Sequence, residues 1–491
     1  MKTIFTGLLC LIFLGISDVQ AQNRFDALRF STQYPVSDAT NASIGGPAAA
    51  SYMNYGSVLR NPATLGMAKQ SSVSFGLGLR DVAEDAIYLD RRRSFDDTEF
   101  GVLNAGYVYK FPTVQGSLVI GGGYSQLMNF NRAFRINGYN TQSSITDYFF
   151  DNDFYFDTAF DAFAIEQDDF GQFPVFRPFF DEPFAGIDQT ASQVESGQIG
   201  EFSISVASEF AENLFVGVSL GIPVGTYAYR LDFLERDTEF VHGDLDTVID
   251  GEDFTIPAVD NIVFRDRIDA DISGFSARAG FVYQPIPNLS LGVSYSLPTR
   301  YRIDESFSTF IQTNYENGGS ESAETRGDNS YQIQTASRLA FGASTHGLPL
   351  NINATIERVG YGRMEFREFP DLGREIELND NIRDDFENVF NIHVGATLNV
   401  SDAIQPTFGY AYLPSASRGS DNASQFITGG LRLGVNQSLS IDLAMQYNIF
   451  DDTQVLYDYF NYNTMDGSFL NETVQSSVTR FHAMVGVNLR F

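Results

Sequence analysis

Apolar residues occupy every second position in long stretches of this chain. The pattern is clearest in residues 72–79, 289–297, 390–400 and 439–447. Successive side chains of a β-strand point to opposite faces, so each stretch has one apolar face and a second, different face. That second face carries glycine, serine, alanine and asparagine, whereas a sheet face in water usually carries more lysine, glutamate and threonine. Small residues suit a crowded interior, and the apolar face suits lipid.

Fourteen stretches of this kind lie between residues 70 and 491. They are residues 70–81, 97–111, 115–130, 197–211, 213–234, 264–285, 287–305, 328–345, 349–369, 386–401, 404–415, 421–436, 437–452 and 475–491. Six of the connections are a few residues long. They alternate with connections that are mostly longer, at residues 82–96, 131–196, 235–263, 306–327, 370–385, 416–420 and 453–474.

Loop lengths that alternate in this way are typical of an outer-membrane barrel. Such barrels have an even number of strands, tight periplasmic turns and long extracellular loops, here above all residues 131–196 and 235–263. A soluble sandwich gives no reason for this segregation of loop lengths. We therefore predict an all-β fold, a transmembrane barrel of about 14 antiparallel strands that comprises residues 70–491.

The N-terminus predicts export from the cytoplasm. Lys2 precedes an apolar run from Ile4 to Ile16, and Val19-Gln20-Ala21 places small residues where a signal peptidase reads them. The run of about 13 residues is shorter than the roughly 20 that a spanning helix needs. We therefore expect residues 1–21 to be a cleaved signal peptide, which removes the single cysteine, Cys10.

Charge and residue counts exclude several classes of protein. The chain has 31 Lys+Arg against 62 Asp+Glu, a net charge of −31, so it presents no basic surface for nucleic acid. One cysteine excludes a disulfide framework, and the four histidines lack metal-ligand spacing. The G-x-S-x-G match at residues 217–221 lies within an alternating strand, where that motif cannot work. We predict no metal, no cofactor and no enzymatic activity.

The end of the chain predicts how the barrel is assembled. Alternate residues from Phe481 to the final residue, Phe491, form one apolar face. A C-terminal amphipathic strand that ends in phenylalanine resembles the signal read by the bacterial barrel assembly machinery. The expected surroundings are the lipids and lipopolysaccharide of the outer membrane of a Gram-negative-type bacterium. The 45 Phe and 24 Tyr fit aromatic girdles at the two membrane interfaces.

Residues 22–69 do not fit the barrel pattern. They are rich in small residues, with glycine and proline at intervals, whereas a free periplasmic tail would be more charged. Fourteen strands enclose more space than their own side chains fill. We therefore expect residues 22–69 to pack inside the lumen as a hatch, or plug.

Three features of the chain occur together: an N-terminal segment with Asn61-Pro62-Ala63, fourteen predicted strands, and the turn and strand at residues 287–295. In these features the whole mature chain resembles the FadL-type outer-membrane transporters. It implies a lumenal hatch and passive uptake of hydrophobic small molecules, long-chain fatty acids or aromatic hydrocarbons, with lateral or periplasmic release. Shuttle proteins of the type IX secretion system, which bind secreted protein cargo, carry the same kind of hatch and are the alternative. Gly45 and Gly46 would give the hatch a permissive backbone for movement.

Two groups of residues are candidates for ligand binding. Residues 149–184 hold twelve phenylalanines, which form either a hydrophobic groove for the ligand or a packed cap over the mouth. The candidates from this region are Phe149, Phe150, Phe154, Phe156 and Phe160. Alternation also places Arg278, Arg338, Arg432 and Arg480 on lumen faces. The first three are candidates to bind a ligand carboxylate, and the alternative is that they pair with lumen acids such as Asp442 and Glu209 or anchor the hatch.

Overall fold

The computed structural model describes residues 23–169, 171–176, 185–249, 251–401, 403–420, 422–460 and 469–491. The expected signal peptide, residues 1–21, lies outside the described residues. Arg177, the one basic residue in the aromatic stretch 149–184, lies outside them as well.

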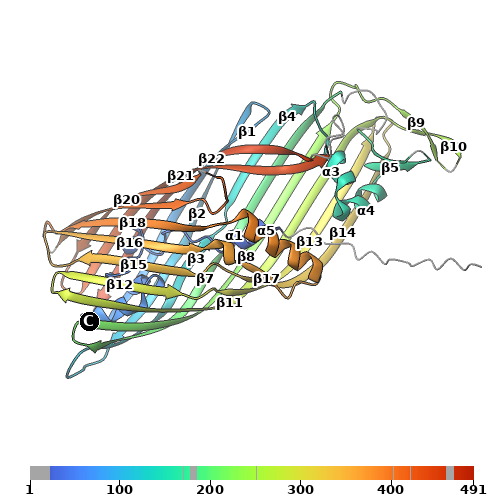
Figure 1. Ribbon diagram of the computed structural model, residues 1–491. Helices are drawn as coiled ribbons and strands as arrows, with labels where there is room; N and C mark the ends of the chain where they lie inside the picture. Colours follow the sequence, from blue (N-terminus) through green and yellow to red (C-terminus); the bar gives the residue numbers. More distant parts are fainter. Residues whose placement is uncertain are drawn as a thin grey trace, which may run out of the picture.

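Fourteen antiparallel strands close into a barrel, as predicted (Figure 1). Four of them are interrupted and carry two labels. The strands are β1 (Ser72–Tyr88), β2 (Arg91–Lys110), β3 (Leu118–Asn129) with β4 (Arg132–Asn140), β7 (Ile187–Ala211), β8 (Leu214–Arg236), β11 (Val259–Ile286), β12 (Leu289–Ser296) with β13 (Arg300–Tyr315), β14 (Ser320–Gln334) with β15 (Arg338–Thr345), β16 (Leu350–Gly360) with β17 (Glu365–Arg367), β18 (Asn388–Leu398), β19 (Ile404–Pro414), β20 (Ala423–Gly434), β21 (Leu439–Phe460) and β22 (Phe469–Arg490). The first and last strands pair from Ser72↔Arg490 to Ile87↔Gln475, which closes the sheet.

The alternation of the sequence becomes the two faces of the wall. On β8, the outward side chains of Val218 and Ile222 are 54% and 59% exposed, whereas Ser219 between them is 1% exposed and faces the lumen. Further along β8 the outward face turns polar, with Arg230 and Asp232. The apolar stretch matches the span of the hydrocarbon layer, so the fold and this belt place the protein in an outer membrane.

The strands run further outward than the alternation predicted. β1 and β2 join through a tight turn at Leu89 and Asp90, so the predicted loop 82–96 is a hairpin. The predicted loop 306–327 is likewise filled by β13 and β14. Within the predicted loops 131–196 and 235–263, residues 132–140, 187–196 and 259–263 belong to barrel strands. The prediction failed there because the outward face of a strand becomes polar once it leaves the bilayer. The apolar residues of these extensions, such as Phe307 and Ile311 of β13, face the interior instead, and the main-chain pairing continues.

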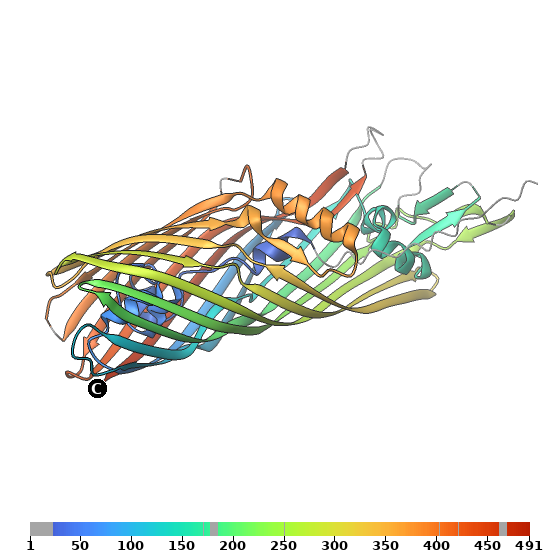
Figure 2. The ribbon, with the colours of Figure 1, turned by 60° about the horizontal axis from the view of Figure 1, so that its bottom comes forward.

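Short helices and hairpins cover the outer end of the barrel. α3 (Ile145–Asp151), α4 (Asp153–Asp161) and the hairpins β5 (Ile165–Asp168)–β6 (Gly171–Pro174) and β9 (Leu245–Ile249)–β10 (Glu252–Ile256) gather at one side of the mouth (Figure 1). α5 (Leu372–Asp385) lies where the wall is shorter, after η3 (Tyr361–Arg363) and β17 (Figure 2). Among the described residues, no helix is long and apolar enough to cross a membrane.

Residues 23–71, called here the N-terminal segment, lie inside the barrel (Figure 2). They form α1 (Arg24–Arg29), α2 (Ala39–Ala42), η1 (Tyr55–Leu59) and η2 (Pro62–Met67), joined by extended stretches. Each of these short helices begins at an asparagine or aspartate whose side chain accepts a hydrogen bond from the first turn. Such local caps stabilise short helices in the N-terminal segment, which is too small to form a core of its own.

Candidate functional site: a lumenal pocket beside a gap in the wall

Glycines on the lumen face of the wall allow the N-terminal segment to pack directly against it. The side-chain amide of Asn61 donates to the carbonyls of Ala49 (2.6 Å) and Phe281 (3.1 Å), and its Oδ1 accepts from the Ala63 amide (3.0 Å). A Cβ at Gly280 would lie 2.1 Å from that Oδ1, and one at Gly217 would lie 2.6 Å from the main chain of Pro62 and Ala63. The glycine-rich face seen in the sequence therefore lets the main chains of wall and segment touch.

Gly45 and Gly46 are held by their backbone conformation and by close contacts. Their φ angles are +81° and +111°, a region that favours glycine. A Cβ on Gly45 would lie 2.8 Å from the carbonyl oxygen of Tyr410, and one on Gly46 would lie 2.9 Å from the Pro35 side chain. Both glycines are needed for this packing. That they also serve as a hinge stays a prediction.

The three candidate arginines all pair with carboxylates. Arg278 forms a fork on Glu201, with contacts of 2.6 and 2.9 Å. Arg432 pairs with Asp442 at 2.6 Å. These pairs match the alternative in which lumen arginines bind lumen acids, and a ligand carboxylate would have to compete with them.

Arg338 belongs to a network that ties the N-terminal segment to the wall. Glu357 on β16 is buried between Arg338 of β15, at 3.2 Å, and Arg60 of the segment. Arg338 also donates to the main-chain carbonyl of Ser31 at 2.6 Å. Arg60 Nη2 lies 3.3 Å from the imidazole of His393. The buried carboxylate of Glu357 thus binds two guanidinium groups, one from the N-terminal segment and one from the barrel wall.

The candidate phenylalanines divide between packing and exposure. Phe149 is buried against Phe264 of β11 (5.2 Å between ring centres), and Phe154 packs on Phe307 of β13 (5.6 Å). Phe156 stacks on Phe160, which is 37% exposed. Phe150 is partly buried against the same cluster. The region is therefore a packed cap over part of the mouth that keeps some aromatic surface in contact with solvent.

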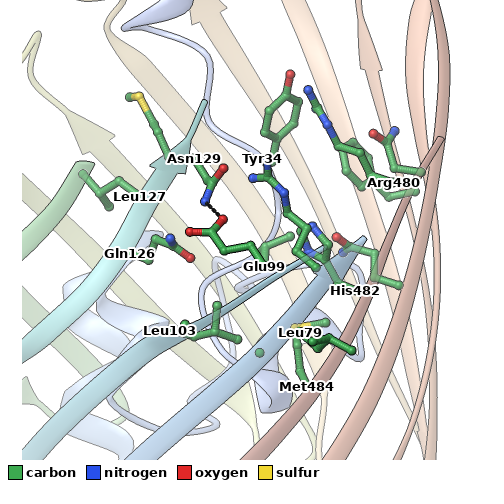
Figure 3. A pocket seen from close by; sticks show the side chains of 18 residues that line it. Tyr34, Leu79, Glu99, Leu103, Gln126, Leu127, Asn129, Arg480, His482 and Met484 are labelled. Atoms are coloured by element: carbon green, nitrogen blue, oxygen red, sulfur yellow. Dashed lines mark hydrogen bonds between the residues drawn. The ribbon is translucent and has the colours of Figure 1, made fainter. Parts of the chain in front are cut away.

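A pocket lies in the lumen between the N-terminal segment and one side of the wall (Figure 3). Its cavity volume is about 50 Å³, and it is partly open to solvent. Much of its wall is apolar, formed by Val36, Leu79, Leu103, Leu127, Met128, Phe426 and Met484. These residues come from the segment and from strands at the two ends of the chain, which the closure of the barrel brings together.

Cationic side chains line one edge of this pocket. The guanidinium of Arg480 lies 4.8 Å from the ring centres of Tyr34 and Phe450. Nε and Nη1 of Arg480, Nε of Arg80 and Nε2 of His482 are buried, and none has a hydrogen-bond partner among the described residues. The three arginine nitrogens are donors, and buried donors without partners are costly. A ligand that brings acceptor oxygens to this edge would satisfy them.

The wall beside the pocket has a gap between β2 and β3. These two strands pair only from Asn104↔Ser125 to Lys110↔Val119. Beyond Asn104 the described residues of β2 pair with β1 alone, and those of β3 and β4 pair with β7 alone. β3 has a bulge between Gln126 and Met128 and then breaks before β4. Among the described residues, β4 stays close to β2 and β1 but forms no main-chain ladder with either.

Several residues of the pocket were not predicted. Alternation puts Arg480 on a lumen face, but Arg480 is not among the ligand-binding candidates. His482, Arg80, Glu99 and Asn129 are not candidates either. Arg80 could have been found, because it continues the small lumen face of β1. Glu99 could have been found as well, because it lies in the predicted strand 97–111, on the face opposite Phe100 and Val102.

The geometry defines a closed outer-membrane barrel with an internal segment and a lumenal pocket. No protein-family model and no curated protein matches the sequence. Solved structures do match. The toluene transporter TodX of Pseudomonas putida aligns at a TM-score of 0.53 and 12% identity over 92% of this chain and 98% of its own.

Two further solved structures give the same result. A Pseudomonas aeruginosa FadL homologue aligns at a TM-score of 0.55 and 11% identity, over 94% of this chain and 100% of its own. The toluene transporter TbuX of Ralstonia pickettii aligns at 0.51 and 15%, over 92% and 98%. This protein therefore has the fold of the FadL-type outer-membrane transporters, which confirms the resemblance at the level of the fold.

Proposed function

We propose that the protein is an outer-membrane channel for passive uptake of hydrophobic small molecules. The observation that carries this proposal is the apolar pocket next to a wall gap that no main-chain ladder closes. A ligand in this pocket has an apolar environment on one side and a route to the bilayer on the other. The N-terminal segment acts as the hatch, and the exposed part of the aromatic cap collects ligand outside.

The release route in this proposal is lateral. The N-terminal segment contacts the wall main chain at several glycines and shares a buried ion network with it. Its displacement would break all of these contacts at once, whereas the gap needs no such change. Membrane lipids and lipopolysaccharide surround the barrel in this proposal, and the strand ending in Phe491 serves its assembly.

The ligand class in this proposal is long-chain carboxylates. TodX and TbuX are named as toluene transporters, and toluene has no group that could use the buried nitrogens of Arg480, Arg80 and His482. A carboxylate has two oxygens for a guanidinium fork, and an acyl chain suits the apolar wall. The secretion-shuttle alternative gains no support from these solved structures, which are named as transporters.

Replacing Arg480 by leucine should reduce oleate uptake about 10-fold or more, because a charge-assisted contact contributes roughly 1.5–3 kcal/mol. The measurement is uptake of labelled oleate and labelled toluene by cells that lack their own transporter and express this protein. Arg302→Leu, at an exposed arginine on the outer face of β13, is the control and should leave uptake unchanged. Equal loss of oleate and toluene uptake would contradict the carboxylate assignment, and no uptake of either would contradict the proposed function.

A further inference from the structure

The gap between β2 and β3 is bridged by side chains at the level of the pocket. The Glu99 carboxylate of β2 accepts hydrogen bonds from the side-chain amides of Asn129 (2.7 Å) and Asn131 (2.8 Å), and Figure 3 shows the first of these. Asn129 ends β3, and Asn131 lies in the break before β4. These three polar side chains thus connect β2 to the end of β3, where main-chain hydrogen bonds connect neighbouring strands elsewhere in the wall.

Arg80 connects this bridge to the pocket. Its Nη2 donates to the main-chain carbonyl of Asn131 at 2.5 Å, and its Nε is buried without a partner among the described residues. Arg80 and Glu99 both line the pocket, together with Arg480. The cation that helps to hold the break in place is therefore also a cation that an arriving ligand would meet.

We infer that Glu99, Asn129, Asn131 and Arg80 form a clasp that keeps the gap shut until an acidic ligand enters the pocket. This inference rests on the proposed function and adds to it the residues that regulate release and the ligand chemistry that operates them. The clasp makes the acidic group a condition for release as well as for binding.

Two electrostatic effects would open the clasp. A ligand carboxylate is a stronger acceptor for Arg80 than the neutral carbonyl of Asn131, so it draws the guanidinium away from the break. The same carboxylate lies near the Glu99 carboxylate, and like charges repel strongly where water is scarce. Glu99 then separates from the two asparagines, and β2 and β3 can part. A neutral ligand of the same shape produces neither effect.

Other side-chain contacts join β4 to this side of the wall. Arg132 of β4 forms a fork on the buried Glu84 of β1, with contacts of 2.7 and 2.8 Å. A second contact provides a matched control: Arg93 of β2 donates to Asn137 of β4 at 2.6 Å, and this contact is exposed and does not line the pocket. It bridges the same two parts of the wall without facing a ligand. Its loss should leave ligand discrimination unchanged.

The test compares oleate with methyl oleate, which has the same chain and no charge. In the native protein we expect oleate to enter cells at least ~10-fold faster than the ester, the factor of about one charge-assisted contact. Glu99→Ala removes the acceptor of both asparagines, so ester uptake should rise to within a few-fold of oleate uptake. Glu99→Gln keeps an acceptor but loses the charge, so oleate uptake should fall while oleate binding to the purified protein stays the same. Arg93→Ala should behave like the native protein.

The outcomes separate the clasp from the route and from simple damage. If the acid-to-ester ratio is the same in the native protein and in Glu99→Ala, and heat-modifiability gels show that both are folded, the clasp is refuted. A second variant, Glu99→Cys with Asn129→Cys, can be joined by a short bifunctional maleimide. Joined protein should bind oleate but not pass it, whereas full uptake through the joined protein would refute lateral release itself.

Discussion

A leucine in place of Gly217 should push the N-terminal segment out of its seat and turn the closed barrel into an open pore. A Cβ at this position already lies 2.6 Å from the main chain of Pro62 and Ala63, and main chain cannot move aside as a flexible side chain can. The lipid-facing side of β8 is unchanged, so the barrel should still form. Conductance in planar bilayers and sensitivity of cells to large antibiotics should both rise severalfold or more.

Gly429→Leu is the matched control for this prediction. Gly429 lies on β20, and a Cβ there would meet nothing within 4 Å. Its leucine variant should conduct no better than the native protein. Low conductance in folded Gly217→Leu would show that the segment can reseat elsewhere, and the glycine-seat argument would then be wrong.

Removal of the Glu357 carboxylate should be the most destabilising single change in the lumen. In Glu357→Ala, the guanidinium groups of Arg60 and Arg338 stay buried without their common anion. Removal of one partner from a buried ion pair typically costs about 3–5 kcal/mol. Urea unfolding in detergent, followed by the heat-dependent shift on gels, should show a midpoint well below that of the native protein.

Glu324→Ala tests whether burial of the ion pair is the reason for the expected loss of stability in Glu357→Ala. Its partner Arg326 is 73% exposed on the side-chain scale, and exposed pairs contribute roughly 0–1 kcal/mol. This variant should unfold almost like the native protein. Were the two variants to lose equal stability, the network around Glu357 would not be the main tie between segment and wall.

The fold could be predicted because the lipid face and the lumen face of a membrane barrel need different residue types, which alternate along each strand. Val218 and Ile222 face lipid and Ser219 faces the lumen because each takes one side of the pleat. The outer halves of β1, β2, β13 and β14 escaped prediction, since the outward face that is apolar in the membrane carries residues such as Asp85 and Arg92 there. Buried apolar residues of β1, such as Tyr88, lie on the opposite, lumenal face. Main-chain pairing holds those halves together, and it leaves no mark on residue type.

The candidate site could be predicted only in part for a different reason. Alternation predicted that Arg278, Arg338 and Arg432 face the lumen. It did not predict which carboxylate pairs with each of them, on the neighbouring strand or two strands away. The pocket joins residues about 400 positions apart, such as Arg80 and Arg480, through barrel closure. Whether those cations are paired or free depends on which acids the register places opposite them, and the sequence pattern does not contain that register.

The length of the strands has a consequence for where a molecule first meets this protein. β11 runs from Val259 to Ile286, 28 residues, which is about 90 Å of chain and about 65 Å of height at a tilt near 45°. The hydrocarbon layer needs only about 25 Å of that height. Under the proposed function, the tall side of the wall therefore extends through the hydrated sugar layer above the lipids. The proposed channel would then bind a hydrophobic solute beyond that layer and deliver it at the level of the bilayer.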